Sequence, residues 1–160
     1  MTETVSITTV RQLLEPAIAV FPPDTPVEKA VESLRTIVQQ NIITYGFLTD
    51  ERGLLVGVFT FRELLFAEKG KTLADISIMQ PFSLDADTHL QDAMQVTVSR
   101  HYPVYPVCDK TGRLLGLVRG YMLFEAQAFE ISAQAGMMQG VDKEERLATH
   151  WLHSLKFRHP

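Results

Sequence analysis

The chain has 160 residues, of which 46% are hydrophobic and 21% are charged, and this composition is typical of a folded protein with a hydrophobic core. The length allows one domain or two small repeated units and excludes a large multidomain enzyme. The formal net charge of -4 argues against a protein that binds nucleic acid by neutralising its phosphates, so nucleic acid is not expected as a partner.

Two further absences narrow the class of protein. Cys108 is the only cysteine, so an internal disulfide or a two-cysteine metal or redox motif cannot form, and a reducing compartment is expected. The sequence has no apolar run of about 18 residues, and its first ten residues lack the basic start and hydrophobic centre of a signal peptide. We therefore expect this segment itself to be soluble and cytoplasmic.

The first part of the chain predicts the order strand, helix, strand, strand, helix. A short strand is expected over 17–21, after Pro16. Strands over 45–49 and 55–60 are joined by a turn that ends in Gly53, and a short helix is expected over 61–67. The first helix, with Asp24-Thr25 expected to cap its start, is indicated by apolar residues at helical spacing: Val27, Ala30, Val31, Leu34 and Val38.

The same order is predicted a second time, so the chain contains an internal repeat. A strand is expected over 82–84, strands over 104–108 and 114–118 are joined by a turn that ends in Gly112, and a last helix begins near Tyr121. The helix between them, with Asp87-Thr88 as its expected cap, is indicated by Leu90, Ala93, Met94 and Val98.

The last helix is expected to continue far beyond its counterpart in the first copy. Its apolar stripe is formed by Phe124, Ala128, Ile131, Ala135 and Met138. The pattern breaks between Gly136 and Gly140 and resumes in a second helical segment with Leu147, Trp151, Leu152 and Leu155. The sequence thus predicts two helical tail segments after the repeated unit.

Both copies of the hairpin carry a family resemblance. Residues 103–118, with the sequence PVYPVCDKTGRLLGLV, resemble the hairpin of a CBS (cystathionine-β-synthase) domain, and residues 57–63, GVFTFRE, resemble the end of that hairpin and the start of the next helix. This resemblance implies an α+β fold of two tandem CBS domains, each a β-α-β-β-α unit. Its expected boundaries are 8–67 for the first domain, 68–75 for a linker and 76–128 for the second domain.

The tail adds a second resemblance. Residues 130–138, 147–149 and 154–160 are similar to the segment that joins the CBS pair of MgtE-type magnesium transporters to their first membrane helix. This resemblance implies that residues 129–160 are a helical tail leading toward a membrane domain absent from this chain, at the cytoplasmic face of the inner or plasma membrane. The basic, tryptophan-containing segment 151–158 fits such a place, and packing on its own domain or on a partner is the alternative.

Adenine nucleotides such as ATP or AMP are common ligands of the family. The resemblance implies that the hydroxyl of Thr60 contacts phosphate and that Glu63, which replaces the usual aspartate, contacts ribose. In the second copy, Arg119 and Met122 occupy these two positions, so this half-site lacks a ribose ligand while Arg119 can pair with phosphate. A helix cap and a solvated carboxylate are the alternative roles of Thr60 and Glu63.

Magnesium is the second candidate ligand, because hard carboxylate oxygens can hold it without a local motif. No spacing selects among the acidic candidates, so the metal ligands stay unassigned; the candidates are Asp85, Asp87, Asp92, Glu125, Glu130, Asp142, Glu144 and Glu145. His150 and His153 would share a helix face and have no evident third ligand for a transition metal.

The sequence carries none of the motifs of a hydrolase nucleophile, a P-loop, a dinucleotide site or a zinc protease, so we expect a protein that is not an enzyme. The resemblance predicts the cytosolic regulatory domain of a magnesium or other divalent cation transporter, which forms a homodimer through its CBS domains, is covalently continuous with a membrane transport domain, and gates transport according to intracellular Mg²⁺. The alternative is a free-standing CBS module that binds an adenine nucleotide and regulates a partner enzyme.

Overall fold

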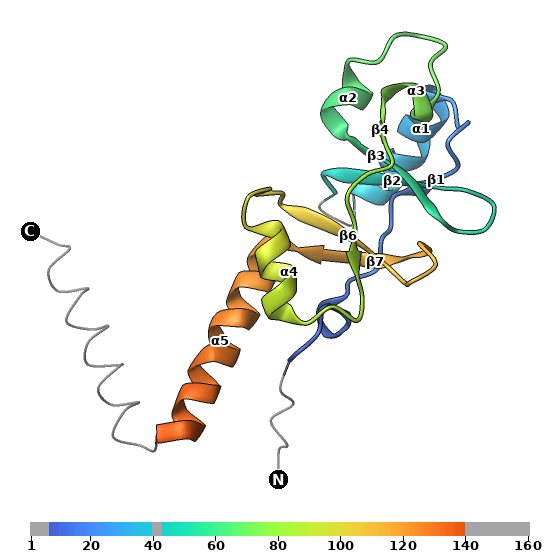
Figure 1. Cartoon of the computed structure of the whole chain (residues 1–160). Coiled ribbons are helices and arrows are strands. Elements are labelled where there is room, and N and C mark those ends of the chain that lie inside the picture. The colour runs from blue at the N-terminus through green and yellow to red at the C-terminus, as the bar shows by residue number, and fades with distance from the viewer. Residues whose placement is uncertain (1–6, 40–42, 140–160) are drawn as a thin grey trace, which may run out of the picture.

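The computed structural model describes residues 7–39 and 43–139 of the chain. It contains two halves, each made of strands and helices, that follow one another in the sequence and lie side by side in space, as Figure 1 shows. One half is built on a four-stranded sheet of order β1-β2-β3-β4 and the other on a three-stranded sheet of order β5-β6-β7. The predicted α+β architecture of two repeated units is confirmed.

The first half contains β1 (Val20–Phe21), α1 (Val27–Val38), β2 (Tyr45–Thr49), β3 (Leu55–Thr60), α2 (Phe61–Leu65), α3 (Leu73–Ile76) and β4 (Ile78–Met79). Strand β1 runs parallel to β2, and the β2–β3 and β3–β4 pairs are antiparallel. The bounds of β2 and β3 are those expected from the sequence. Strand β1 is shorter at its start than the expected 17–21, because only Val20 and Phe21 pair with β2.

The second half contains β5 (Leu84–Asp85), α4 (Leu90–Thr97), β6 (Val104–Cys108), β7 (Leu114–Arg119) and α5 (Gly120–Gln139), and the 3₁₀ helix η1 (Val10–Leu13) precedes both halves. Strand β5 is parallel to β6, and β6 is antiparallel to β7. The two halves therefore repeat the same strand pairing. The turn glycines Gly53 and Gly112 have φ values of +81° and +91°, as the hairpin prediction requires.

The predicted helix caps are wrong in both copies. Helix α1 begins after Pro26 and α4 begins after His89, and neither residue caps its helix with a side-chain hydrogen bond. Thr25 instead donates its hydroxyl to the carbonyl oxygen of Pro22 at 2.8 Å, and Asp87 accepts from Arg11. Both dipeptides thus lie at the turns that precede the helices, one residue too early to cap them.

Each half has its own hydrophobic core. In the first core, the buried residues are Ala19, Val27, Ala30, Leu34, Leu48, Phe59, Leu64 and Leu73. In the second core, they are Val10, Leu13, Leu84, Ala86, Leu90, Ala93, Tyr105, Val107, Val118 and Leu123. The apolar positions that predicted α1 and α4 are buried at the start of each helix, whereas Val38 and Val98 near the ends are 41% and 52% exposed.

Short segments are exchanged between the halves. Helix η1 comes before the first half in the sequence, yet it contributes Val10 and Leu13 to the second core. Strand β4 lies just before the second half and pairs with β3 of the first half. The domain boundaries predicted from the sequence, 8–67, 68–75 and 76–128, stay a prediction. In the structure, η1 and β4 each pack with the half that lies further along or further back in the chain.

The exchange joins the halves through main-chain hydrogen bonds. The N–H of Glu15 donates to the carbonyl of Leu117 at 2.8 Å, and the N–H of Leu117 donates back to Glu15 at 2.9 Å. The two hairpin turns also meet, because Leu55 N–H donates to Gly112 and Leu114 N–H donates to Gly53, each at 3.0 Å. These contacts fix one half against the other.

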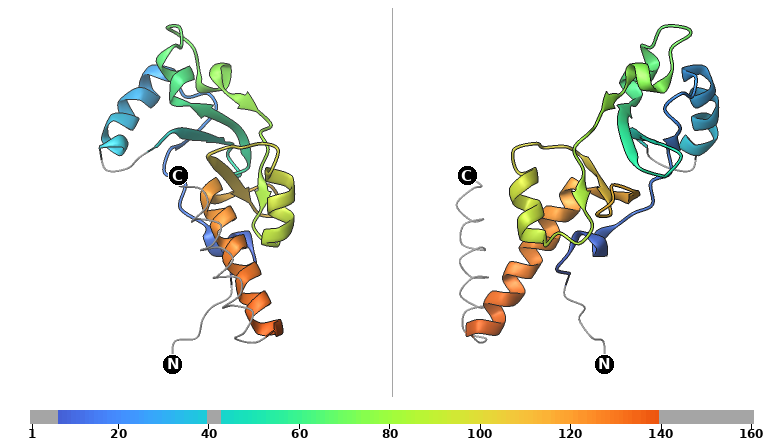
Figure 2. Two further views of the ribbon diagram at one scale, coloured as in Figure 1. Left: turned by 90° about the vertical axis from the view of Figure 1, so that its left-hand side faces the viewer. Right: turned by 45° about the vertical axis from the view of Figure 1, so that its right-hand side comes forward.

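Helix α5 projects from the second half beyond both sheets, as both views in Figure 2 show. Its 20 residues correspond to a length of about 30 Å. The helix continues through Gly136 to Gln139, so the predicted break at Gly136 is wrong over this range. The predicted apolar stripe does not face the core: Phe124 is 45% exposed and Ile131 is 57% exposed, while Leu123 is buried.

No helix within 7–39 or 43–139 is both long enough and apolar enough to cross a membrane. The predicted second tail segment with Trp151 lies outside the residues that the structure describes.

Candidate functional site

A pocket of about 260 Å³ lies where the two halves meet. Residues from the segment before β1, from the start of β2 and from the neighbouring ends of β6 and β7 form its walls: Glu15, Pro16, Ile18, Ala19, Ile43, Thr44, Tyr45, Phe47, Val104, Leu117 and Arg119. Neither half forms this pocket alone. A ligand in this pocket would therefore contact both halves.

The pocket combines an apolar floor with a few polar groups. Ile18, Ala19, Phe47 and Val104 contribute hydrocarbon surface, and Tyr45 contributes a phenol from the first residue of β2. Burial raises the pKa of the Tyr45 hydroxyl, and the nearby charge of Glu63 acts in the same direction. An apolar cavity with a small number of placed polar groups is the usual composition of a small-molecule site.

Arg119 and Glu15 are the charged residues of the pocket wall. The Nε of Arg119 donates to Oε2 of Glu15 at 2.9 Å, and their side chains are 37% and 40% exposed. Arg119 is the last residue of β7, and Gly120 begins α5 directly after it. Arg119, the residue predicted to bind phosphate, thus lines the pocket at the point where the projecting helix begins.

Thr60 and Glu63 form the N-terminal cap of α2. The N–H of Thr60 donates to Oε2 of Glu63 at 2.6 Å, the Thr60 hydroxyl donates to the same carboxylate, and the N–H of Glu63 donates to Oγ1 of Thr60 at 3.4 Å. This reciprocal arrangement is a capping box, the alternative role considered for these residues. Their contact with a nucleotide stays a prediction.

The capping box lies beside the pocket and does not line it. Thr60 is paired with Tyr45 across β2 and β3, and the N–H of Phe61 donates to the carbonyl of Thr44 at 3.3 Å. The structure therefore places Arg119 in the pocket wall, and it places Thr60 and Glu63 beside Tyr45, at the end of β3 and the start of α2. Met122, at the position of the missing second ribose ligand, packs against the second core.

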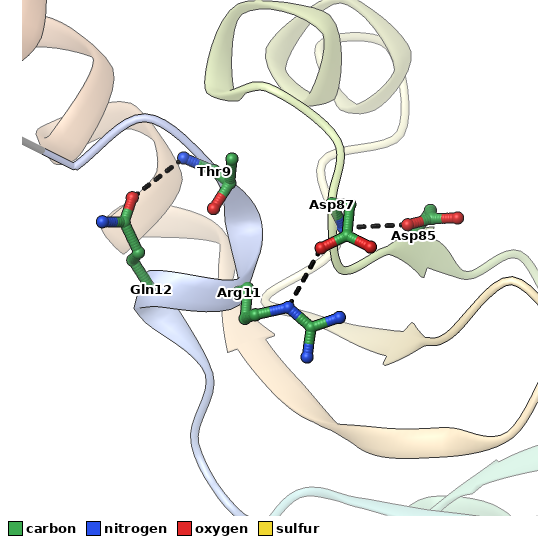
Figure 3. Close-up of polar contacts among 5 residues, drawn as sticks. All are labelled: Thr9, Arg11, Gln12, Asp85 and Asp87. Atoms are coloured by element: carbon green, nitrogen blue, oxygen red, sulfur yellow. Dashed lines mark hydrogen bonds and ion pairs between the residues drawn. The ribbon is translucent and has the colours of Figure 1, made fainter.

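Those acidic residues considered for magnesium that the structure describes are not gathered into one site. Figure 3 shows Asp87 accepting from Nε of Arg11, at 3.0 Å, while the N–H of Asp87 donates to Oδ1 of Asp85 at 2.8 Å. The hydrogen bond from Arg11 holds the pKa of Asp87 below its usual value. The guanidinium of Arg11 thus stands beside this acidic pair.

The other metal candidates are dispersed. Asp92 lies on α4, and Glu125 and Glu130 lie on α5. Within the described ranges, no three or more His, Cys, Asp or Glu side chains are close enough together to hold a metal ion. The remaining candidates, Asp142, Glu144, Glu145, His150 and His153, lie outside the described residues.

Sequence reasoning missed Glu15 and Tyr45 as pocket residues. Glu15 reaches Arg119 across a separation of 104 residues, so no local pattern connects the two positions. A weaker signal was present in the repeat: Leu14-Glu15-Pro16 aligns with Met79-Gln80-Pro81, and both segments are placed on the sheet of the opposite repeat.

Comparison with known proteins agrees with this architecture. The model of the CBS domain family matches residues 10–70 and 73–128. The magnesium transporter MgtE of Thermus thermophilus is 30% identical over 93 residues, which are 58% of this chain and 21% of that protein. Inosine-5'-monophosphate dehydrogenase of Thermoplasma acidophilum is 26% identical over 107 residues, which are 67% of this chain and 21% of that enzyme. The chain thus spans about a fifth of the length of these relatives.

Solved structures show the same fold. The cytosolic domain of the Mg²⁺ channel MgtE in complex with ATP matches with a TM-score of 0.65 and 26% identity, over 71% of this chain and 46% of that chain. CBSX2 from Arabidopsis thaliana matches with a TM-score of 0.61 and 25% identity, over 78% of this chain and 96% of that chain. Because the family model covers both halves, the chain belongs to the CBS domain family, as a tandem pair that resembles the cytosolic domain of MgtE.

Proposed function

We propose that the chain is the cytosolic ligand-sensing domain of a magnesium or other divalent cation transporter, and that it gates transport according to intracellular Mg²⁺. The similarity to MgtE supports this assignment at the level of the whole domain. The observation that carries it is the direct continuity between Arg119 in the pocket wall and Gly120 at the start of α5. The proposed role is regulatory rather than catalytic.

An adenine nucleotide is the proposed ligand of the pocket. Its apolar floor suits a purine ring, and Arg119 offers a guanidinium for phosphate. The solved MgtE cytosolic domain is a complex with ATP, and a CBSX2 structure of the same fold is a complex with AMP. Contact of Thr60 and Glu63 with ribose or phosphate would require the capping box to open. We therefore assign the main contact with phosphate to Arg119.

The proposed output is a change in the direction of α5. Besides α4, this helix contacts β7 and η1, and β7 is also bonded to Glu15 from the segment before the first half. A ligand that binds better to one arrangement of the halves shifts the population toward that arrangement. The shift reaches α5 because no loop separates it from β7.

Magnesium enters this proposal as a second regulatory ligand, held by carboxylates whose identity is open. A transporter-regulating domain requires Mg²⁺ to favour one arrangement, and the size of the response is limited by the difference in affinity between the two arrangements. On the full chain, we expect a saturable rise in melting temperature during a Mg²⁺ titration at constant ionic strength. A change that equal ionic strength of K⁺ reproduces would contradict a specific site.

We also propose that the domain forms a homodimer through its CBS halves and sits at the cytoplasmic face of the membrane that holds the transport domain. Exposed apolar side chains occupy equivalent positions in the repeat: Leu65 in α2 is 80% exposed and Phe124 in α5 is 45% exposed. Phe66, next to Leu65, is also 80% exposed. Such apolar surface on a soluble fold favours association.

A chimeric transporter tests the regulatory role. The CBS pair of Thermus thermophilus MgtE would be replaced by residues 7–139, and Mg²⁺ uptake into liposomes would be measured at several Mg²⁺ concentrations on the side of the domain. We expect uptake to fall as that concentration rises. A matched chimera with the CBS pair of CBSX2, which has the same fold, is expected to give uptake that does not depend on it.

The second candidate function is a free-standing nucleotide-binding module that regulates a partner enzyme. It is favoured by the match to CBSX2, because this chain covers 96% of that protein chain. The two candidates differ in the chimera: a free-standing module would bind AMP in solution but leave Mg²⁺ uptake unregulated, as the CBSX2 control does.

A further inference from the structure

We propose that Glu15 is an internal competitor for the phosphate-binding group of the pocket, so that it lowers the affinity for ligands carrying a phosphate and leaves the affinity for neutral ligands unchanged. This inference rests on the proposed binding of an adenine nucleotide and adds the residue that limits how tightly the site holds the phosphate. The structural feature behind it is the ion pair between Arg119 and Glu15, in which the two charged residues of the pocket wall neutralise each other.

The ion pair occupies only part of the guanidinium. Arg119 has five N–H donors, and its Nε donates to Oε2 of Glu15 at 2.9 Å. A phosphate that enters the pocket would compete with this carboxylate for the positive charge of Arg119, even where it accepts from other N–H donors of the guanidinium. Once Glu15 has moved away, the uncompensated positive charge of Arg119 faces the apolar floor and favours an anion.

The geometry lets the side chain of Glu15 move while its backbone stays in place. The main-chain N–H and C=O of Glu15 are both bonded to Leu117 of β7, at 2.8 and 2.9 Å. Pro16 follows and fixes the backbone direction. The side chain is 40% exposed, so it can rotate into water without breaking the contact between the halves.

Close packing maintains this arrangement. A Cβ at Gly116 would lie 2.3 Å from the carbonyl oxygen of Glu15, so the segment that carries Glu15 approaches β7 only because residue 116 is glycine. Glu15 therefore stands beside Arg119 whenever the halves are joined as they are here. The fold itself therefore supplies the carboxylate that pairs with Arg119.

The cost of displacing Glu15 is small, because the ion pair is partly exposed. Pairs of this kind contribute little in water, which corresponds to an affinity difference of about two- to fivefold. A phosphate that displaces Glu15 carries more negative charge than the carboxylate and accepts from the same guanidinium, so it gains more from Arg119 than the broken pair costs. A ligand without phosphate would leave the pair intact and gain nothing from Arg119.

Isothermal titration calorimetry on the full chain tests the inference with AMP and with adenosine. The substitution Glu15→Gln keeps the shape and removes the charge, so we expect AMP to bind about two- to fivefold more tightly and adenosine to bind as in the unaltered chain. The same change of net charge at an exposed position of α1, Glu32→Gln, is the control and is expected to alter neither affinity.

A double-mutant cycle assigns the effect to Arg119. We expect Arg119→Gln to weaken AMP binding about tenfold or more, and to abolish the effect of Glu15→Gln when the two are combined. If AMP binds the unaltered chain and Glu15→Gln leaves its affinity unchanged, the inference is overturned and the nucleotide proposal stands. If neither protein binds AMP, both are overturned. Equal tightening of AMP and adenosine would also overturn it, since phosphate would then play no part.

Discussion

At the scale of single residues, the side chains of Thr60 and Glu63 show how a candidate ligand pair can already be engaged in folding. The two residues satisfy each other and the free N–H groups at the start of α2. The resemblance to nucleotide-binding CBS domains draws attention to the same positions. A variant at Thr60 therefore affects stability as well as any ligand contact.

We expect Thr60→Ala to lower the free energy of unfolding by about 1 kcal/mol, the usual cost of losing an N-terminal cap. Thr60→Ser keeps a hydroxyl and is expected to retain most of this stability. Urea unfolding of both variants measures the difference. Equal losses in Thr60→Ala and Thr60→Ser would contradict a capping role for the hydroxyl.

The ion pair of Asp87 with Arg11 predicts a pH dependence. The hydrogen bond from Arg11 lowers the pKa of Asp87 in the folded state. A depressed folded pKa contributes stability above the unfolded pKa of about 4, and this contribution is lost as the pH falls through the folded pKa. We therefore expect Asp87→Asn to be less stable than the unaltered chain at pH 7 and to lose less stability on acidification to pH 3.

Unfolding midpoints in urea at pH 7 and pH 3 check this prediction. Asp92→Asn, at an exposed position of α4, makes the same change of charge away from Arg11 and is the control. The interpretation fails if Asp87→Asn and Asp92→Asn change the acid dependence by the same amount.

At the scale of elements, sequence patterns predicted those strands and turns that depend on interactions between neighbouring residues. The bounds of β2, β3 and β6 follow from apolar runs next to turn glycines, and Gly53 and Gly112 have the positive φ that those turns require. Helix α3 and strand β4 were missed because they are short and depend on packing against the first half. The exchange of η1 and β4 between halves, and the pocket between them, rest on pairings of distant segments that periodicity cannot reveal.

Glycine at position 116 is predicted to be essential for one of these distant pairings. A Cβ there would meet the backbone oxygen of Glu15 at 2.3 Å, so Gly116→Ala must displace a backbone segment and is expected to cost about 1–3 kcal/mol. Gly57 holds the equivalent position in β3, where a Cβ would meet only side-chain atoms of Leu48 and Met79 at 3.0 and 3.1 Å.

Gly57→Ala is therefore the matched control and should cost less, because side chains give way more easily than backbone. Chemical unfolding gives both values. A smaller loss in Gly116→Ala than in Gly57→Ala would mean that the segment around Glu15 is not held against β7 as described.

At the scale of the whole molecule, α5 presents apolar side chains that the described fold does not cover. Phe124, Phe129 and Ile131 are between 45% and 67% exposed. Phe124 also occupies the position in the repeat that Leu65 holds in α2, so each half exposes an apolar side chain at the same place. This arrangement is the basis for the proposed homodimer.

We expect the combined variant Leu65→Glu and Phe124→Glu to sediment as a monomer at concentrations where the unaltered chain sediments as a dimer. Both side chains are exposed, so the fold is expected to persist, and circular dichroism checks this. The variant Lys29→Glu, at an exposed position of α1, changes the net charge by the same amount and in the same direction, and it is the control. A folded variant that remains dimeric would place the interface elsewhere.

We propose that a ligand in the pocket between the halves changes the direction of α5 relative to the first half. This change can be measured as a distance between spin labels on Ser33→Cys in α1 and Ser132→Cys in α5, because both serines are exposed and Cys108 is only 4% exposed. We predict that saturating AMP shifts the distance distribution in the unaltered background and leaves it unchanged in Arg119→Gln. A distribution that stays the same while calorimetry shows AMP bound would contradict the account.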